Sequence, residues 1–582
     1  MWNKIILTIF VVSVVYAQEM SESEKINQFF EEKFVEQVDR SPMMQGYLGI
    51  KKDQDKWGDL SDAFAKETLE ITKKNLKELK ETINYSALNS DTKVSYDLFV
   101  GSCEQEIADF KYRFHNYPVN QMFGLQSRLP SFLINFHSIG NKIDAEAYIS
   151  RLRKVKALFA QLVTNLKTRE KMGIIPPKFV FAYVIDDSKN IINSSTILDD
   201  FSSKVQVIDG LDKEVLIAQA KKAISESVKP GYQLLVDYMR ELEKKADTRA
   251  GVWKFPNGSD FYYHALKKTT TTNLTAEQIF EIGKNEVARI HGEMEQIMKK
   301  VKFKGTLKEF FEFMRSDKQF FYANTDEGRE RYLKEAREMI NTMKGKLDEL
   351  FISKPKADLI VKRVESFREK SAGKAFYNRP AANGSRPGIY YVNLYNMDDM
   401  PVYQMEALAY HEGVPGHHMQ LAIAQEMNTL PKFRKFGGYT AYIEGWGLYS
   451  EFIPKEMGFY EDPYSDFGRL AMEIWRACRL VVDTGIHYKK WTREQGIKFY
   501  MENTPNPKGD AVKMVERHIV MAGQATAYKI GMIKIIELRE KAKKTLGNKF
   551  DIREFHEVVI ANGAIPLFVL EKYIDEWVAS KK

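Results

Sequence analysis

Residues 411–420, HEGVPGHHMQ, bring together three of the chain's ten histidines and one glutamate. The stretch is close to the zinc-peptidase pattern His-Glu-x-x-His, but Pro415 stands where the second histidine should be. His417 and His418 lie about 9 Å and 10.5 Å beyond His411 along a straight helix. Because zinc–nitrogen bonds are only about 2.1 Å long, neither spacing lets one ion bridge an unbroken helix. A metal site here therefore requires a break in the helix.

The segment 414–416, Val-Pro-Gly, supplies a cause for such a break. Proline removes a helix hydrogen-bond donor, and glycine permits unusual backbone angles. If the first helix ends near Glu412, two residues are inserted, and His417 returns to the place of the missing histidine. His418 would then point away from the metal and hydrogen-bond a carboxylate such as Glu406. Without a metal, the same histidines could form a surface turn between two helices.

A second acidic motif follows at 442–451, YIEGWGLYSE. Glu444 and Glu451 are seven residues apart, so both can face one side of a helix. Gly445 and Gly447 cost helix stability, which indicates a close approach by another part of the backbone. A histidine pair followed by a glutamate on a later helix is the arrangement of zinc peptidases with a glutamate as third ligand. The alternative is a pair of solvated helix charges.

Four ordered motifs resemble one known family, called domain of unknown function 885: HEGVPGHHMQ, EGWGLYSE, DTGIHYKKWT and AGQATAYKIG. That family is large, mostly helical and often exported, and is regarded as related to the glutamate-type (gluzincin) zinc metallopeptidases. The resemblance covers most of the chain after its first residues, with its strongest motifs between about 376 and 531. The family usually has proline before 523–525, where this chain has Ala522, a difference that changes no functional side chain.

The resemblance implies a role for each residue of the central motifs. His411 and His417 would bind Zn²⁺ with Glu444 as third ligand, and Glu412 would be the general base. The preference for His417 over His418 depends on this resemblance and on the two-residue insertion.

Two further residues are candidates for a supporting role. Asp483 and His487 share a helix face, so the aspartate could orient His487 beside the site, although a purely structural pair fits as well. Tyr528 could donate to an oxyanion, as buried tyrosines do in related peptidases, or it could be a core tyrosine. Arg517 or His518 could also reach the cleft. Five further histidines have no partner pattern and are interpreted as structural: His115, His137, His264, His291 and His556.

The elements that must position these residues are mostly helices. Capping boxes at Ser21-x-x-Glu24 and Thr275-x-x-Gln278 open two of them. Apolar periodicity predicts further helices over 61–83, 145–168, 211–246, 330–350, 465–490 and 513–545. The segment 178–186, KFVFAYVID, is compatible with a strand or a buried helix.

One segment is typical of a strand. Ile389 to Val392 form a β-rich run after a stretch rich in Pro and Gly, so we expect a short strand directly before the histidine helix. Asp398 or Asp399 would cap that helix, with Pro401 near its first position. The predicted fold is mainly α: a large helical metallopeptidase-like body with a short β segment beside the zinc helix and a deep substrate cleft.

The chain divides into three expected regions. Residues 1–17 are typical of a signal peptide, with Lys4 before a short apolar run and a small-residue ending at Ala17. That run is too short for a comfortable membrane span, so we expect a secreted or periplasmic protein with no stable span after cleavage. An N-terminal helical region over 18–250 and a catalytic zinc-hydrolase region over 251–582 meet at the turn-rich segment 247–260.

Composition narrows the partners. The net charge is +8, from 87 basic and 79 acidic residues. The basic residues form no dense tract, so nucleic acid is not expected as a partner. With only Cys103 and Cys478 there is no disulfide framework, and whether these two pair is left open.

These patterns predict a secreted zinc-dependent hydrolase, a metallopeptidase that acts on a peptide or small peptide-like substrate. The alternative is a catalytically silent helical binding protein that retains the metal site. No Glu-x-x-His, Gly-x-Ser-x-Gly or phosphate-loop motif is present, which excludes the usual signatures of di-iron bundles, serine hydrolases and P-loop enzymes.

Overall fold

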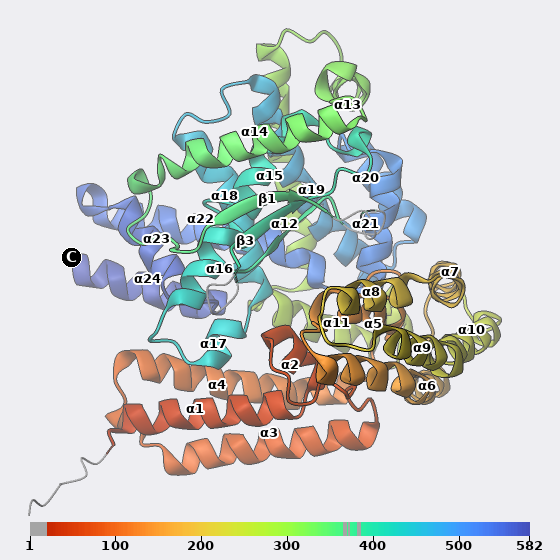
Figure 1. Cartoon of the computed structure of the whole chain (residues 1–582). Helices are drawn as coiled ribbons and strands as arrows, with labels where there is room; N and C mark the ends of the chain where they lie inside the picture. The colour runs from red at the N-terminus through yellow and green to blue at the C-terminus, as the bar shows by residue number, and fades with distance from the viewer. Residues whose placement is uncertain (1–19, 365–368, 370–372, 381–385) are drawn as a thin grey trace, which may run out of the picture.

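A computed structural model describes residues 20–364, 369, 373–380 and 386–582. The chain is mainly helical, as predicted, and three short strands form one small sheet near the middle of Figure 1. The expected signal peptide at 1–17 lies outside the described residues.

The N-terminal helices form a layer at the bottom of Figure 1: α1 (Glu22–Asp39), α2 (Pro42–Leu48), α3 (Asp62–Thr82) and α4 (Ser90–Asp109). The predicted capping box of Ser21 and Glu24 opens α1. Phe30 and Leu79 lie in a small core between these helices, against which Phe433 of the main body packs.

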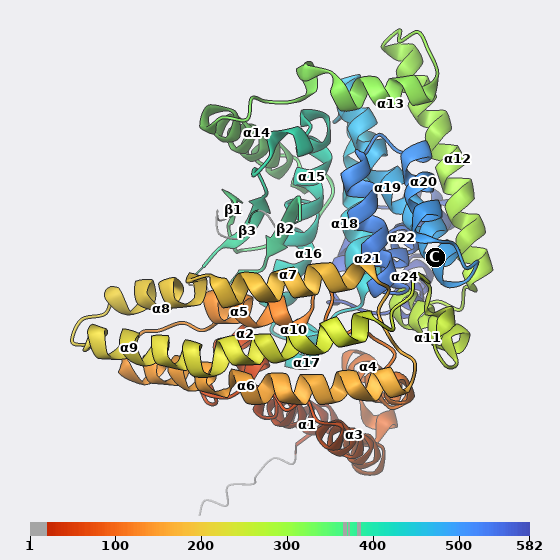
Figure 2. The same ribbon diagram turned by 90° about the vertical axis from the view of Figure 1, so that its right-hand side faces the viewer.

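The next six helices lie side by side and extend from the body as an arm (Figure 2): α5 (Leu125–Phe136), α6 (Lys142–Lys171), α7 (Phe179–Asn193), α8 (Thr196–Gln206), α9 (Lys213–Ala223) and α10 (Lys229–Glu243). The ambiguous segment 178–186 is helix, because Val180, Phe181, Val184 and Ile185 recur at helical spacing and are buried in the core of the arm.

The main body contains the remaining helices: α11 (Gly258–Thr270), α12 (Ala276–Lys300), α13 (Leu307–Ser316), α14 (Asp326–Lys344), α15 (Met405–Glu412), α16 (His417–Glu426), α17 (Lys432–Phe436), α18 (Thr440–Glu456), α19 (Pro463–His487), α20 (Arg493–Asn503), α21 (Lys508–Val520), α22 (Ala527–Leu546), α23 (Ile552–Ile560) and α24 (Leu567–Lys581). Helix α19 packs along α12, and α18 packs along α22. The second predicted capping box, of Thr275 and Gln278, opens α12.

The single helix predicted over 513–545 is wrong. The chain turns between α21 and α22, where Gly523 adopts a φ of 82° that favours glycine. The backbone N–H of Gly523 donates to the Asp483 carboxylate, 3.0 Å away on α19, so a contact from another helix stabilises the turn.

The sheet has the order β1 (Leu359–Arg363), β3 (Gly388–Val392), β2 (Ala375–Asn378). β3 pairs parallel with β1 and antiparallel with β2, and all five of its residues are buried. The predicted strand is therefore confirmed.

The predicted cap of the histidine helix is wrong. Asp398 and Asp399 belong to a separate 3-10 turn, in which the side chain of Asn396 accepts from the Asp398 N–H. Pro401 opens a second 3-10 turn, and α15 begins only at Met405.

Cys103 and Cys478 are both buried and form no disulfide. Within the part of the chain that the structure describes, no single helix is long and apolar enough to cross a membrane; the bent pair Lys508–Val520 and Gln524–Lys549 passes that test only when taken together.

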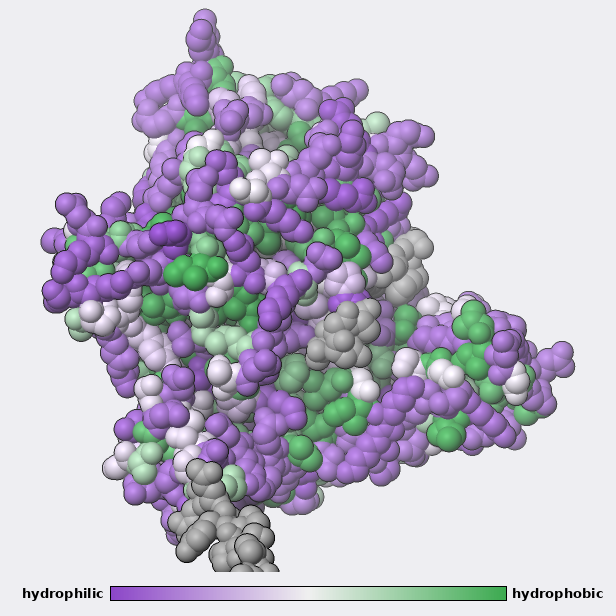
Figure 3. Space-filling model, turned by 60° about the vertical axis from the view of Figure 1, so that its left-hand side comes forward, coloured by the Kyte–Doolittle hydropathy of each residue, from purple (hydrophilic) through white to green (hydrophobic). Residues whose placement is uncertain are grey.

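Figure 3 shows a mostly hydrophilic face on which hydrophobic residues gather in a hollow beside the lobe at lower right.

Candidate metal centre

The predicted helix break lies between α15, which ends at Glu412, and α16, which begins at His417. Helix α18 holds the break in place, because the Trp446 side chain donates to the carbonyl oxygen of Pro415 at 2.9 Å. Gly416 admits no side chain, since a Cβ there would lie 2.0 Å from the carbonyl oxygen of His411. The backbone can therefore fold back closely enough to bring the two histidines together.

His411, His417 and Glu444 converge at the end of this break. Their candidate ligand atoms all lie within 4.8 Å of one another. Glu444 Oε2 is 3.8 Å from His411 Nε2 and 3.6 Å from His417 Nε2. Ligands about 2.1 Å from a tetrahedral zinc ion are separated by about 3.4 Å, so both the donor types and their spacing fit zinc.

Gly447 lets the two imidazoles approach α18. A Cβ at this position would lie 2.8 Å from His411 Cε1 and 3.1 Å from His417 Cε1. Gly445, on the same helix, lies against Gly531 of α22, where a Cβ would meet backbone atoms at 2.5 Å. The predicted close backbone approach is confirmed at Gly445, whereas Gly447 faces the two histidine side chains.

Glu451 fixes the orientation of His411. Its Oε1 lies 2.7 Å from His411 Nδ1, which leaves Nε2 directed toward Glu444. This is the carboxylate–histidine contact that metal sites use to set the tautomer of a ligand. The sequence placed Glu451 on the same helix face as Glu444 but gave it no role, and the seven-residue spacing was the available signal.

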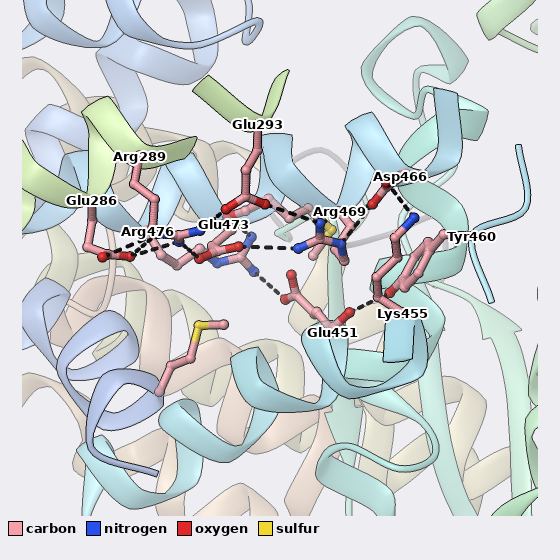
Figure 4. Close-up of polar contacts among 12 residues, drawn as sticks. Glu286, Arg289, Glu293, Glu451, Lys455, Tyr460, Asp466, Arg469, Glu473 and Arg476 are labelled. Atoms are coloured by element: carbon pink, nitrogen blue, oxygen red, sulfur yellow. Dashed lines mark hydrogen bonds and ion pairs between the residues drawn. The ribbon is translucent and has the colours of Figure 1, made fainter. Parts of the chain in front are cut away.

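A buried ionic network lies behind Glu451 (Figure 4). Arg476 Nη2 on α19 is 3.6 Å from Glu451 Oε1. One helical turn away, Glu473 pairs with Arg469 on α19, with Arg289 on α12 and with Lys529 on α22. Because these charges are paired, the network joins three helices behind the centre without leaving Glu473 uncompensated.

The local electrostatics separate the carboxyl groups into two kinds. Burial raises the pKa of Glu412 to about 7, which suits a group that must take up a proton near neutral pH. Burial acts in the same direction on Glu444, but the hydrogen bond and charge of His417, together with the charges of His411 and Arg479, outweigh it and hold the pKa of Glu444 at about 2. Glu444 therefore stays ionised, as a metal ligand must.

His418 lies on the other side of α16 from the cluster, as predicted, but its predicted partner is wrong. Its Nε2 donates to the carbonyl oxygen of Ala357 at 3.0 Å, and its Nδ1 lies 3.0 Å from the Tyr377 hydroxyl of β2. Glu406 instead accepts from the hydroxyls of Tyr410 and Ser465. The sheet packs against α16 here, and sequence spacing could not show this.

The predicted pair of Asp483 and His487 is also wrong. His487 Nδ1 accepts from the Val252 N–H at 3.1 Å, and Nε2 donates to the carbonyl oxygen of His518 at 2.9 Å. Asp483 accepts from the Tyr262 hydroxyl at 2.7 Å. Both ring nitrogens of His487 are thus used by backbone groups, so this histidine holds elements together and is not available to a substrate.

Tyr528 is connected to the candidate metal centre through Arg479. Its ring centroid lies 4.3 Å from the guanidinium carbon of Arg479, whose charge helps to lower the pKa of Glu444. Its hydroxyl is 3.5 Å from Arg517 Nη2. No sequence pattern pointed to Arg479, whereas Arg517 was expected to be able to reach the cleft. The oxyanion role of Tyr528 stays a prediction.

Comparisons with known proteins agree on the family and the fold. The family model described as "Bacterial protein of unknown function (DUF885)" matches residues 42–574. The crystal structure of a "putative lipoprotein" from Colwellia psychrerythraea is 31% identical, with a TM-score of 0.91 over 96% of this chain and 100% of that one. A "putative lipoprotein of unknown function" from Shewanella oneidensis is 19% identical, with a TM-score of 0.75 over 96% and 100% of the two chains. No curated protein matches.

Proposed function

Because this chain belongs to the DUF885 family, whose description assigns no function, we propose from its candidate centre that it is a zinc-dependent hydrolase, and most specifically a peptidase. One observation carries the proposal: the ligand atoms of His411, His417 and Glu444 lie within 4.8 Å of one another, next to the buried carboxyl group of Glu412. Two histidines and a glutamate are the ligand set of a catalytic zinc site that keeps an open position.

The chain's own residues divide the work of hydrolysis. His411, His417 and Glu444 would hold Zn²⁺, which when bound would supply a Lewis acid to polarise a carbonyl group and acidify water. Glu412 accepts the proton of the attacking water and then gives it to the leaving amine. Glu451 holds the ring of His411 in position throughout.

The assignment to peptide bonds, and to a gluzincin-type enzyme with a deep substrate cleft, rests on the motif resemblance. It is supported by the glutamate ligand, which comes from a helix later in the chain than the histidine pair. The order of ligands, base and break agrees with a two-residue insertion into His-Glu-x-x-His.

We also propose that the protein is exported, with residues 1–17 removed. The two similar structures are described as putative lipoproteins, which is consistent with a place in the cell envelope. The first cysteine of this chain is Cys103, which is buried in α4. Because a buried thiol cannot carry a lipid, we propose export without a lipid on Cys103.

Metal analysis combined with peptide digestion tests the function. We expect about one zinc ion per purified chain and cleavage of a peptide library that stops with a chelator and returns with Zn²⁺. Full activity without metal would overturn the hydrolase mechanism. Bound zinc with no cleavage of any peptide would instead favour the silent binding protein.

A further inference from the structure

Arg479 is a buried charge without a carboxylate partner. It projects from α19 and is only 5% exposed, and its Nε and Nη1 atoms have no hydrogen-bond partner. Among the described residues, no carboxylate oxygen forms an ion pair with it, and its guanidinium group lies over the face of the Tyr528 ring. Because buried charges are normally paired, an isolated guanidinium here needs an explanation.

Arg517 on α21 adds a second such group next to the same tyrosine. Its Nη2 donates to the side-chain oxygen of Gln524 at 3.0 Å and lies 3.5 Å from the Tyr528 hydroxyl. Its Nε is buried without a partner, and it forms no ion pair with any carboxylate in the described part of the chain. Two guanidinium groups therefore lie against Tyr528, that of Arg479 over its ring and that of Arg517 near its hydroxyl.

This basic cluster, Arg479, Arg517 and Tyr528, adjoins the candidate metal centre. Gly531, about one helical turn after Tyr528 on α22, packs against Gly445, the neighbour of Glu444 on α18. The neighbouring arginine on the same face of α19, Arg476, is already paired with Glu451.

A count of charges shows what the cluster lacks. Even with Glu412, Glu444 and Glu451 all ionised, a bound Zn²⁺ and Arg476 would balance their three negative charges, so the charges of Arg479 and Arg517 remain in excess. Glu444 keeps 21% of its side-chain surface exposed and Arg517 is half-buried, so the centre and the basic cluster both reach the protein surface.

We propose that Arg479, supported by Arg517 and Tyr528, binds a carboxylate of the substrate beside the reacting bond. A carboxylate supplies the missing negative charge, and a guanidinium binds it through two parallel hydrogen bonds. This inference rests on the proposed function and narrows its substrate class to peptides that carry a carboxylate near the cleaved bond.

The carboxylate has two possible sources with the same chemistry. The C-terminal carboxylate would make the protein an exopeptidase that removes one or a few residues from the C-terminus. An aspartate or glutamate side chain would make it selective for acidic residues within a peptide.

Binding measured without turnover tests the proposal. Zinc-loaded Glu412→Gln protein is titrated into three pools of hexapeptides labelled with an uncharged coumarin: free acids without acidic residues, their C-terminal amides, and amides that carry one glutamate. We expect the free acids to bind about tenfold or more tightly than the plain amides, as one charge-assisted interaction allows. Tight binding of the glutamate pool instead assigns the carboxylate to a side chain.

Replacement of Arg479 shows whether that preference belongs to the cluster. Adding Arg479→Gln to the same protein should bring the acid and amide pools to within about twofold. Arg479→Lys should restore part of the difference, because the charge is kept and the two-point geometry is lost. Arg434→Gln is the matched control, since Arg434 is also 5% exposed but donates to Ser95 and Asn562, away from the centre, and it should keep the full preference.

A stability readout separates binding from a structural role. Replacing Arg479 breaks no ion pair. The variants should therefore keep their zinc and unfold at the wild-type temperature or higher. Equal binding of acids and amides, a preference that survives Arg479→Gln, or loss of zinc and stability on that change would each overturn the proposal.

The two proposals fail in different ways. Cleavage of acids and amides at equal rates with equal binding would leave the hydrolase standing and remove the carboxylate site. Arg479-dependent binding of free acids without cleavage of any peptide would keep the site and remove the hydrolase.

Discussion

The two histidines of the candidate centre are held unequally. His411 Nδ1 is fixed by the buried carboxyl group of Glu451, whereas His417 Nδ1 is buried without a hydrogen-bond partner in the described part of the chain. The ring of His411 is therefore oriented before any metal arrives, and that of His417 has more freedom to adjust.

At this scale the role of Glu412 can be tested directly. Glu412→Gln should keep its zinc and lose hydrolysis by about 100-fold or more, because the amide has the same size but cannot accept a proton. Zinc content and turnover are measured on the same preparation. Near-normal turnover would show that another residue is the base.

The choice between the adjacent histidines is a second test. His417→Ala should lose bound zinc, because its Nε2 faces Glu444. His418→Ala should keep it, because this ring contacts Tyr377 and the carbonyl oxygen of Ala357. Elemental analysis of both variants measures their bound zinc. Loss of zinc in the His418 variant alone would make His418, not His417, the second ligand.

At the scale of elements, the position of α18 beside the break between α15 and α16 determines the geometry of the centre. Helix α18 supplies Glu444 as the third candidate ligand, Glu451 as the partner of His411, and Trp446 as the donor to the break. Movement of this helix would change all three contacts together.

Gly447 provides a test of how closely α18 must approach. Gly447→Ala should lower zinc affinity by about tenfold or more while the protein stays folded, since the new methyl group would displace the rings of His411 and His417. The matched control is Gly292→Ala in α12, where a Cβ meets nothing within 4 Å. That change should raise stability by roughly 0.5–1 kcal/mol and leave zinc binding intact. Equal zinc affinity in both variants would contradict this account.

Helix α23 contributes a pH dependence of stability through His556. Its Nδ1 donates to the carbonyl oxygen of Leu350, its Nε2 lies 2.9 Å from the Tyr449 hydroxyl of α18, and burial lowers its pKa from 6.5 to about 3. The unfolded chain therefore takes up a proton below pH 6.5 that the folded chain refuses. The stabilisation is complete above pH 6.5 and is lost as the pH falls toward 3.

His556→Gln should remove this term. The variant should be less stable than the wild type at pH 8, and the gap should narrow by about 1.4 kcal/mol per pH unit below pH 6.5. Urea unfolding of both proteins without metal, from about pH 8 to about pH 5, measures the gap. A gap that does not change with pH would show that His556 titrates normally.

At the scale of the whole molecule, metal binding should be coupled to stability, because the ligands come from three helices that meet only in the folded chain. Removal of zinc with a chelator should lower the unfolding temperature; at free zinc about 100-fold above the dissociation constant, the lost stabilisation is about 2.7 kcal/mol. Glu444→Ala should show no chelator effect. An identical shift in that variant would place the metal elsewhere.

The sequence by itself determined the local features of this protein. Periodicity predicted α3, α6 and α19, a β-rich run predicted β3, and the Pro-Gly pair in 413–416 predicted the break that separates α15 from α16. Such features depend on neighbours within a few residues, and the chain order records those neighbours. The residue types His411, Glu412, His417 and Glu444, with the motif resemblance, were enough to nominate the centre.

Only the tertiary structure decided the partners. Glu451 binds His411 across 40 residues, His418 contacts Ala357 across 61, and Asp483 receives the N–H of Gly523 across 40 instead of pairing with His487 four residues away. A polar side chain in a packed interior hydrogen-bonds whichever group the packing of helices and sheet brings within about 3 Å. Spacing within one helix cannot specify that group, because it depends on how other elements dock against it.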